Sequence, residues 1–221
     1  MYADKVECLA DFQQLEKQGY IDIYYGDESG FSLNCVIPYC WQFKGEPVLI
    51  LPQRGKTLNV LGFMKSSGDA LQVFTKEGSI KAEFIINSIH VFANSLVKPT
   101  VLILDNARIH HAKIVQSCIE AWEEKGLYIF YLPTYSPHLN RIERLWKESK
   151  YRWVPPSAYA NLSTLGQKLD EIWAKFGEDY KINFSQQKVE IFLSDYLSYL
   201  SILLLGSVTL VQWVTAFLLL K

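Results

Sequence analysis

Three acidic residues stand at positions where carboxylates could hold metal ions. Asp27 ends a short strand-like run, Asp105 follows the apolar run 101–104, and Glu143 lies in the first turn of a predicted helix. Magnesium prefers oxygen ligands, usually a few carboxylates together with water and substrate phosphates. Two such ions can activate an attacking water and stabilise a leaving oxygen, as phosphodiester cleavage requires. The three acids therefore suggest metal-dependent cleavage of phosphodiesters.

Each of these residues also has an ordinary structural explanation. An aspartate at the end of a strand is commonly a turn or capping residue. A glutamate in the first turn of a helix interacts favourably with the helix dipole. His110 and His111 are interpreted as a solvent-exposed helix start rather than as a metal-binding pair. Residue type and position alone leave the metal-binding and the structural interpretations open.

Hydrophobic periodicity predicts the elements that position the acids. Alternation over residues 21–27 predicts a strand whose inward face includes Asp27. The run 101–104 is apolar throughout, which is typical of a strand covered on both faces. Strand and helix patterns alternate along the chain, so we expect an α/β fold with a mixed sheet flanked by helices. Asp27 and Asp105 would then lie at the carboxyl ends of strands, where open α/β sheets bind ligands.

Helix and strand patterns recur along the rest of the chain. Helices are predicted over about 4–18, 81–96, 112–125, 140–153 and 162–176, and further strands over 48–51, 58–64, 70–74 and 127–132.

The predicted helix 140–153 carries the third acid and a run of basic residues. At about 100° per residue, Ile142, Trp146 and Ser149 share one face, and Glu143 lies at its edge. Basic side chains give proteins their sequence-independent contacts with DNA phosphates. The candidates on this helix are Arg141, Arg144, Lys147 and Lys150. A solvated basic face is the alternative.

Composition bounds the class of protein. The 221 residues are 49% hydrophobic, which suffices for one domain with a sizeable core. The net charge is −1, whereas autonomous DNA-binding domains are typically basic. Any DNA binding would therefore rely on local basic patches or on a separate partner. The four cysteines form no C-x-x-C pair, which favours reduced thiols over a zinc site.

Three blocks of sequence resemble the signature motifs of DDE transposases, and are most similar to the bacterial insertion-sequence branch of the mariner superfamily. They are Asp-Glu-Ser-Gly-Phe (27–31), Leu-Asp-Asn-Ala-Arg-Ile-His (104–110) and Leu-Pro-Thr-Tyr-Ser-Pro-His-Leu-Asn-Arg-Ile-Glu-Arg-Leu-Trp (132–146). The blocks occur in the family's order, and 37 residues separate Asp105 from Glu143, near the family's usual spacing. The resemblance covers about residues 1–184.

The resemblance implies a ribonuclease-H-like fold and two Mg²⁺ ions, for which Mn²⁺ would substitute. Asp27, Asp105 and Glu143 match the residues that both bind these metals and catalyse the reaction. Asn106 and Asn140 match neighbouring polar positions that shape the site. The implied activity is DNA cleavage at the ends of an insertion sequence, followed by attack of the freed 3′ hydroxyl on target DNA.

The chain departs from the family's pattern in its third block and at its start. Arg141 replaces a usual proline, and His138 stands where an acid is common. No helix-turn-helix region precedes the first block, so we expect either the product of a split or frame-shifted gene or a separate helix-turn-helix polypeptide as DNA-binding partner. A homodimer is also considered. The alternatives are a non-enzymatic remnant, which would inhibit full-length transposase, and a host nuclease of the same fold, which the third block disfavours.

The last departure is a hydrophobic tail. Residues 196–220 carry no charge and are long enough to span a bilayer, which needs about 20 apolar residues. A membrane anchor, a self-associating helix and an out-of-frame extension are the three interpretations, and the third is preferred because the family has no such segment. We therefore expect a catalytic domain over 1–184, a hydrophobic C-terminal appendage over 185–221, and a bacterial cytoplasmic, nucleoid-associated location.

Overall fold

The computed structural model describes residues 2–34, 44–45 and 56–184. The strand predicted over 48–51 and the hydrophobic tail 196–220 lie outside these ranges. Contacts group Phe12–Phe184 into one compact unit and place residues 2–11 in another, and helix α1 (Tyr2–Lys17) includes residues of both. Among the helices described, none has the length and apolar character needed to cross a membrane.

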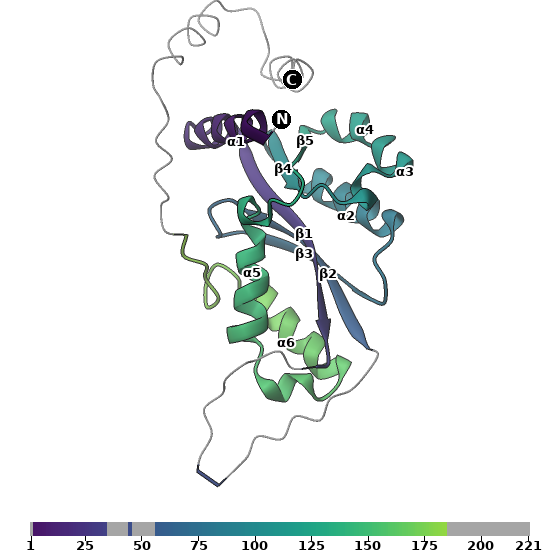
Figure 1. Ribbon diagram of the computed structural model, residues 1–221, viewed down its shortest axis with the longest axis vertical. Helices are drawn as coiled ribbons and strands as arrows, with labels where there is room; N and C mark the ends of the chain where they lie inside the picture. Colours follow the sequence, from purple (N-terminus) through teal and green to yellow (C-terminus); the bar gives the residue numbers. More distant parts are fainter. Residues whose placement is uncertain (1, 35–43, 46–55, 185–221) are drawn as a thin grey trace, which may run out of the picture. The chain divides into compact units, whose positions relative to one another are not determined.

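A five-stranded mixed sheet forms the centre of the larger unit (Figure 1). Its strands are β1 (Asp22–Ser32), β2 (Thr57–Lys65), β3 (Leu71–Glu77), β4 (Thr100–Leu104) and β5 (Leu127–Tyr131). They are arranged in the order β3-β2-β1-β4-β5. The pairs β1–β2 and β2–β3 are antiparallel, and the pairs β1–β4 and β4–β5 are parallel. The expected α/β architecture is confirmed.

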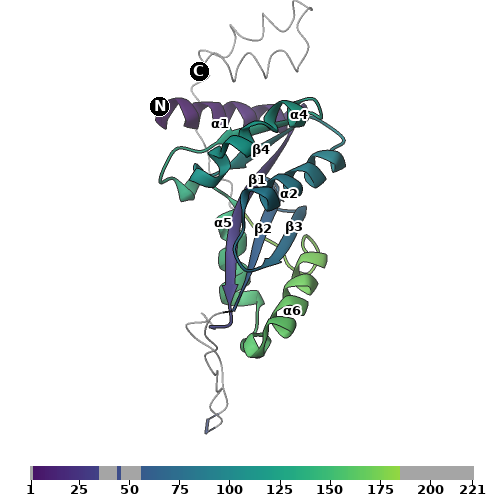
Figure 2. The same cartoon turned by 90° about the vertical axis from the view of Figure 1, so that its right-hand side faces the viewer.

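Helices cover both faces of the sheet. The α-helices after α1 are α2 (Ala82–Ser95), α3 (Lys113–Gln116), α4 (Ile119–Glu123), α5 (Ile142–Glu148) and α6 (Leu162–Ala174). The shorter helical turns are η1 (Arg108–His111), η2 (Pro137–Leu139), η3 (Ser149–Trp153) and η4 (Pro156–Ala160). Figures 1 and 2 show α2 on one face of the sheet and α5 on the other.

The α2 face holds an aromatic and aliphatic core. Phe92 of α2 packs against Tyr24 of β1, with ring centroids 4.9 Å apart, and against Phe63 of β2 at 5.0 Å. Trp122 of α4 is fully buried in the same cluster. Since side chains alternate between the faces of a strand, the residues next to Tyr24 and Phe63 in sequence point to the α5 face.

The α5 face depends on a close approach to β2. A Cβ atom on Gly62 would lie 2.7 Å from Cη2 of Trp146, so α5 packs at this distance only because residue 62 is glycine. Trp146 also meets Phe31 of β1 and Trp173 of α6, with centroids 6.4 and 6.1 Å away. These rings join β1, α5 and α6 and fix the position of the helix that carries Glu143.

Two predicted helices differ from those observed, and side chains explain both differences. The single helix expected over 112–125 is divided into α3 and α4, because Ser117 Oγ and Cys118 Sγ both donate to the carbonyl of Ile114 (2.9 and 3.3 Å). Such side-chain bonds compete with backbone N–H groups for the carbonyls that hold a helix together. The helix expected over 140–153 begins at Ile142 and becomes the π-helical turn η3 at Ser149, whose Oγ donates to the Leu145 carbonyl at 2.8 Å.

Candidate active site

The β1–β4 register places the first two acids next to each other. The last parallel pair is Tyr25 with Ile103. Continuing the register by two residues sets Asp27 beside Asp105, which directly follows β4. Asp27 alternates with Tyr25 and Ile23 along β1, so its side chain points to the α5 face.

Asp27 does not end its strand, contrary to the expectation. β1 continues to Ser32, and Asp27 pairs with Gly62 of the antiparallel neighbour β2. The parallel pairing of β1 with β4 ends at Tyr25, before Asp27. Beyond Asp27, β1 continues as a strand because its backbone hydrogen bonds are made with β2.

Two contacts anchor the start of α5 to β1. Trp146 Nε1 donates a 3.0 Å hydrogen bond to Asp27 Oδ2. Asn140, buried just before the helix, donates through Nδ2 to the Gly26 carbonyl at 3.2 Å. Its Oδ1 is buried and accepts no hydrogen bond from the part of the chain that is described. Glu143, in the first turn of the helix, is exposed, and its carboxylate has no hydrogen bond or ion pair within those residues.

The acids perturb one another electrostatically. Burial, followed by the charges of Glu143, Glu28 and Asp105, raises the pKa of Asp27 to about 7. In contrast, a hydrogen bond with His110 holds the pKa of Asp105 below its usual value. Clustered carboxylates repel one another, and an added cation would relieve that repulsion.

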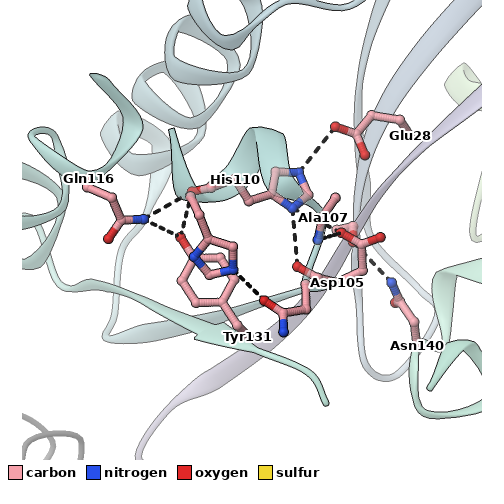
Figure 3. A network of polar contacts seen from close by, with 10 residues as sticks. Glu28, Asp105, Ala107, His110, Gln116, Tyr131 and Asn140 are labelled. Atoms are coloured by element: carbon pink, nitrogen blue, oxygen red, sulfur yellow. Dashed lines mark hydrogen bonds and ion pairs between the residues drawn. The ribbon is translucent and has the colours of Figure 1, made fainter. Parts of the chain in front are cut away.

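His110 lies between two acids and is completely buried, so its interpretation as a solvated helix start is wrong. Its Nδ1 is 3.0 Å from Asp105 Oδ1, and its Nε2 is 3.2 Å from Glu28 Oε1 (Figure 3). Burial alone would lower the pKa of His110, but the hydrogen bonds to Asp105 and Glu28 raise it to about 10. The imidazole is therefore held as a cation at neutral pH.

The second asparagine expected to shape the site, Asn106, is exposed, and its Oδ1 contacts Nε2 of His111. The His111 ring packs against Tyr131 with centroids 4.4 Å apart. Asn106 thus orders the loop after β4, whereas Asn140 touches the strand that carries Asp27.

The four basic candidates lie just before α5, on it and in the turn η3 that follows it. Lys147 and Lys150 share the edge of Glu143, and Lys150 feels the charges of Glu143 and Asp27 although burial lowers its pKa. Arg141 lies elsewhere and donates through Nη1 to the Ser66 carbonyl at 2.9 Å. Arg144 donates through Nε to Glu148 at 2.8 Å. Their contact with DNA stays a prediction, and Lys150 is the one that interacts electrostatically with the acids.

Sequence reasoning missed Glu28, His110 and Trp146. All three belong to the blocks that carry the acids. Glu28 points to the face opposite Asp27, as the alternation of a strand predicts. The one available signal was a histidine five residues after Asp105, since imidazoles often hold carboxylates that have a functional role.

The donor set suits a hard divalent cation. Within residues 2–34, 44–45 and 56–184, no three His, Cys, Asp or Glu side chains are arranged to hold a metal ion as they stand. The carboxylates of Asp27, Asp105 and Glu143 nevertheless come from adjoining elements, and the side chain of Glu143 is exposed and free to turn. Oxygen donors of this kind match magnesium and manganese better than zinc or copper.

Comparisons with known proteins identify the family and the fold. The family described as DDE superfamily endonuclease matches residues 22–166. The insertion element IS630 uncharacterized 39 kDa protein of Shigella sonnei is 28% identical over 127 residues, which cover 57% of this chain and 36% of the relative. The chain thus spans about a third of that relative's length.

Solved structures share the fold at low identity. The Mos1 strand transfer complex matches with a TM-score of 0.51 and 18% identity, over 79% of this chain and 54% of that one. The Mos1 mariner paired end complex with Mn gives 0.52 and 18%, over 80% and 55%. The corresponding complex with Mg gives 0.52 and 20%, over 81% and 55%. The expected ribonuclease-H-like fold is confirmed.

Proposed function

The chain belongs to the DDE superfamily endonuclease family, and on that premise we propose that it cleaves DNA with divalent metal ions and transfers the cut strand to target DNA in the transposition of an insertion sequence. One observation carries the proposal. Asp27 lies beside the position of Asp105, and a hydrogen bond from Trp146 ties Asp27 to the helix that begins with Glu143. These two relationships support a site in which the carboxylates of Asp27, Asp105 and Glu143 act together.

Asp27, Asp105 and Glu143 would hold two Mg²⁺ ions, with Mn²⁺ as a substitute. When bound, such ions activate an attacking water or 3′ hydroxyl and stabilise the leaving oxygen. The raised pKa of Asp27 supports this assignment, because a cation would offset the repulsion from Glu143, Glu28 and Asp105 that favours the protonated acid.

The chain's other residues orient this set and its substrate. The Trp146 indole fixes one oxygen of Asp27, and Asn140 fixes the backbone at Gly26. Lys147 and Lys150, on the edge of Glu143, would bind the phosphates that flank the scissile bond. The arrangement would therefore supply metal ligands and phosphate contacts on neighbouring residues of α5 and η3.

The relatives support DNA ends as substrate. The structures that share the fold are a Mos1 strand transfer complex and Mos1 paired end complexes with Mn or Mg, and the curated relative belongs to an insertion element. With a net charge of −1, the chain would rely on a helix-turn-helix polypeptide to recognise the element ends. Assembly as a homodimer would bring two ends together.

Nicking of supercoiled plasmid by the purified full chain tests the proposal. We expect nicking with Mg²⁺ or Mn²⁺, and its loss in Asp105→Asn and Glu143→Gln. Glu120→Gln, an exposed acid on α4, is the matched control and should nick normally. Retained activity in Asp105→Asn would overturn the assigned role. A folded chain that does not nick, but inhibits an intact related transposase, would support the inhibitor alternative instead.

A further inference from the structure

A completely buried histidine connects the candidate metal site to an acid on the opposite face of β1. His110 Nδ1 lies 3.0 Å from Oδ1 and 3.2 Å from the backbone oxygen of Asp105. Its Nε2 lies 3.2 Å from Oε1 of Glu28. Both ring nitrogens thus face oxygen atoms of acidic residues. A ring in this setting cannot turn without breaking its contacts at both ends.

The backbone of His110 is fixed as firmly as its ring. Its carbonyl accepts from Gln116 Nε2 at 3.0 Å and from Tyr131 Oη at 3.1 Å (Figure 3). These donors come from α3 and from β5, the strand next to β4. The short turn η1 is therefore braced by its neighbours, and the imidazole is presented to Asp105 in one orientation.

The two oxygens of Asp105 have different environments as a result. Oδ1 receives the Ala107 N–H at 3.1 Å and the His110 Nδ1–H. Oδ2 receives no hydrogen bond from the described part of the chain, and the side chain is 47% exposed. One oxygen is thus held by the protein, and the other is available to a ligand.

We propose that His110, itself held by Glu28, is a positioning residue that fixes the Asp105 carboxylate with Oδ1 inward and Oδ2 presented to the metal ion. The inference rests on the proposed function of this site. Hydrogen-bonding partners of metal ligands set the ligand's orientation, and their loss typically lowers metal affinity by about 10- to 100-fold. Glu28 contributes by orienting His110, not by binding metal.

Two substitutions of His110 separate positioning from a merely structural role. The amide nitrogen of asparagine can take the place of Nδ1, and that of glutamine the place of Nε2. His110→Asn therefore keeps the donor to Asp105, whereas His110→Gln keeps only the donor to Glu28. Mn²⁺ binding to the full chain, followed by electron paramagnetic resonance, should weaken about tenfold in His110→Gln and by less than about threefold in His110→Asn.

Two further variants complete the test. Glu28→Gln changes a side chain that is 23% exposed, so it should fold even if both His110 variants unfold, and it should weaken Mn²⁺ binding by about threefold or more. His90→Gln is the matched control, because His90 accepts from Trp122 on α4, a residue outside the acid network. It should leave Mn²⁺ affinity unchanged.

The outcomes distinguish this inference from the proposed function. If the wild-type chain binds Mn²⁺ and the folded His110→Gln and Glu28→Gln variants bind it equally well, the positioning role is overturned and the proposed function stands. Equal losses of Mn²⁺ affinity in His110→Asn and His110→Gln would also overturn the positioning role, since the loss would then not depend on whether a donor to Asp105 is kept. A wild-type chain that binds no Mn²⁺ would overturn both.

Discussion

Trp146 donates a 3.0 Å hydrogen bond from its indole Nε1 to Oδ2 of Asp27, across 119 positions of sequence. Trp146 is three residues after Glu143 on α5, so one contact couples the strand of the first acid to the helix of the third. Trp146 is also held by Phe31 and Trp173. The distance between the two acids is thereby set by the packing of a buried indole.

Trp146→Phe tests this coupling. The substitution keeps an aromatic ring but removes the N–H that orients Asp27. A hydrogen bond to a charged group contributes about 1.5–3 kcal/mol, so metal-dependent nicking should fall by roughly tenfold or more. The control is Trp173→Phe in the same cluster, whose Nε1 is buried without a partner in the described residues. If both variants nick at the wild-type rate, the indole does not orient Asp27.

Asp27→Asn should make the metal-free protein more stable at alkaline pH. Burial and neighbouring carboxylates raise the pKa of Asp27 from 3.8 to about 7. An acid with a raised pKa contributes stability that is complete below its unfolded pKa and is lost as pH rises through its folded pKa. At pH 8 the charged aspartate therefore opposes folding, and removing it should gain roughly 2 kcal/mol.

Urea unfolding with EDTA at pH 5 and pH 8 measures this effect. The stability advantage of Asp27→Asn over wild type should be larger at pH 8, and Mg²⁺ should stabilise the wild type but not the variant. A variant less stable than wild type at pH 8 without metal would show that Asp27 is not under electrostatic strain.

Local pattern was enough to predict the framework of the fold. Alternation placed Tyr25 and Asp27 on one face of β1, and the apolar run before Asp105 predicted β4. Ile142 and Trp146 of α5 and Ser149 of η3 are all buried, as the helical periodicity of this segment indicated. These features depend on residues close in sequence, where the periods of strand and helix apply directly.

The environment of the acids depended on distant residues and could not be predicted. His110 is buried, and its Nε2 faces Glu28, which lies 82 positions away in the sequence. Asp27 lies within its strand, not at its end, because β2 extends the pairing of β1 beyond β4. Neither fact follows from periodicity, since each needs the register between strands to be known first.

Lys150→Gln should reduce the salt dependence of DNA binding, and Arg141→Gln should not. Each phosphate contact contributes about −0.9 to the slope of log affinity against log salt concentration. Lys150 lies near Glu143 and Asp27, whereas Arg141 is engaged with the Ser66 carbonyl and packs 4.5 Å from the Phe184 ring.

Fluorescence anisotropy with labelled duplex DNA, between about 50 and 200 mM salt, measures both slopes. The slope for Lys150→Gln should be smaller in magnitude by about one unit, and the free energy of unfolding of this variant should equal that of the wild type. Arg141→Gln should instead lower stability and keep the wild-type slope. A smaller salt-dependence slope in Arg141→Gln would show that Arg141 does contact DNA.

Gly62→Ala should disturb the site by moving α5. The new Cβ would lie 2.7 Å from Cη2 of Trp146 and 3.2 Å from Cδ1 of Ile142. Trp146 is 3% exposed and enclosed by aromatic rings, so its indole cannot turn aside and the helix must shift outward. Overpacking of this kind costs about 1–3 kcal/mol.

Gly166→Ala is the matched control, and it should change stability in the opposite direction. Its Cβ would meet only Leu58 Cδ1 at 3.6 Å, an ordinary contact, within helix α6. Alanine inside a helix is favoured over glycine by about 0.5–1 kcal/mol, so this variant should gain stability and nick normally. Gly62→Ala should lose stability and, because the shift of α5 stretches the bond from Trp146 to Asp27 and carries Glu143 away, should also nick more slowly per folded molecule. Normal nicking by the folded fraction of Gly62→Ala would show that the site tolerates displacement of the helix, and that the close packing at Gly62 serves stability alone.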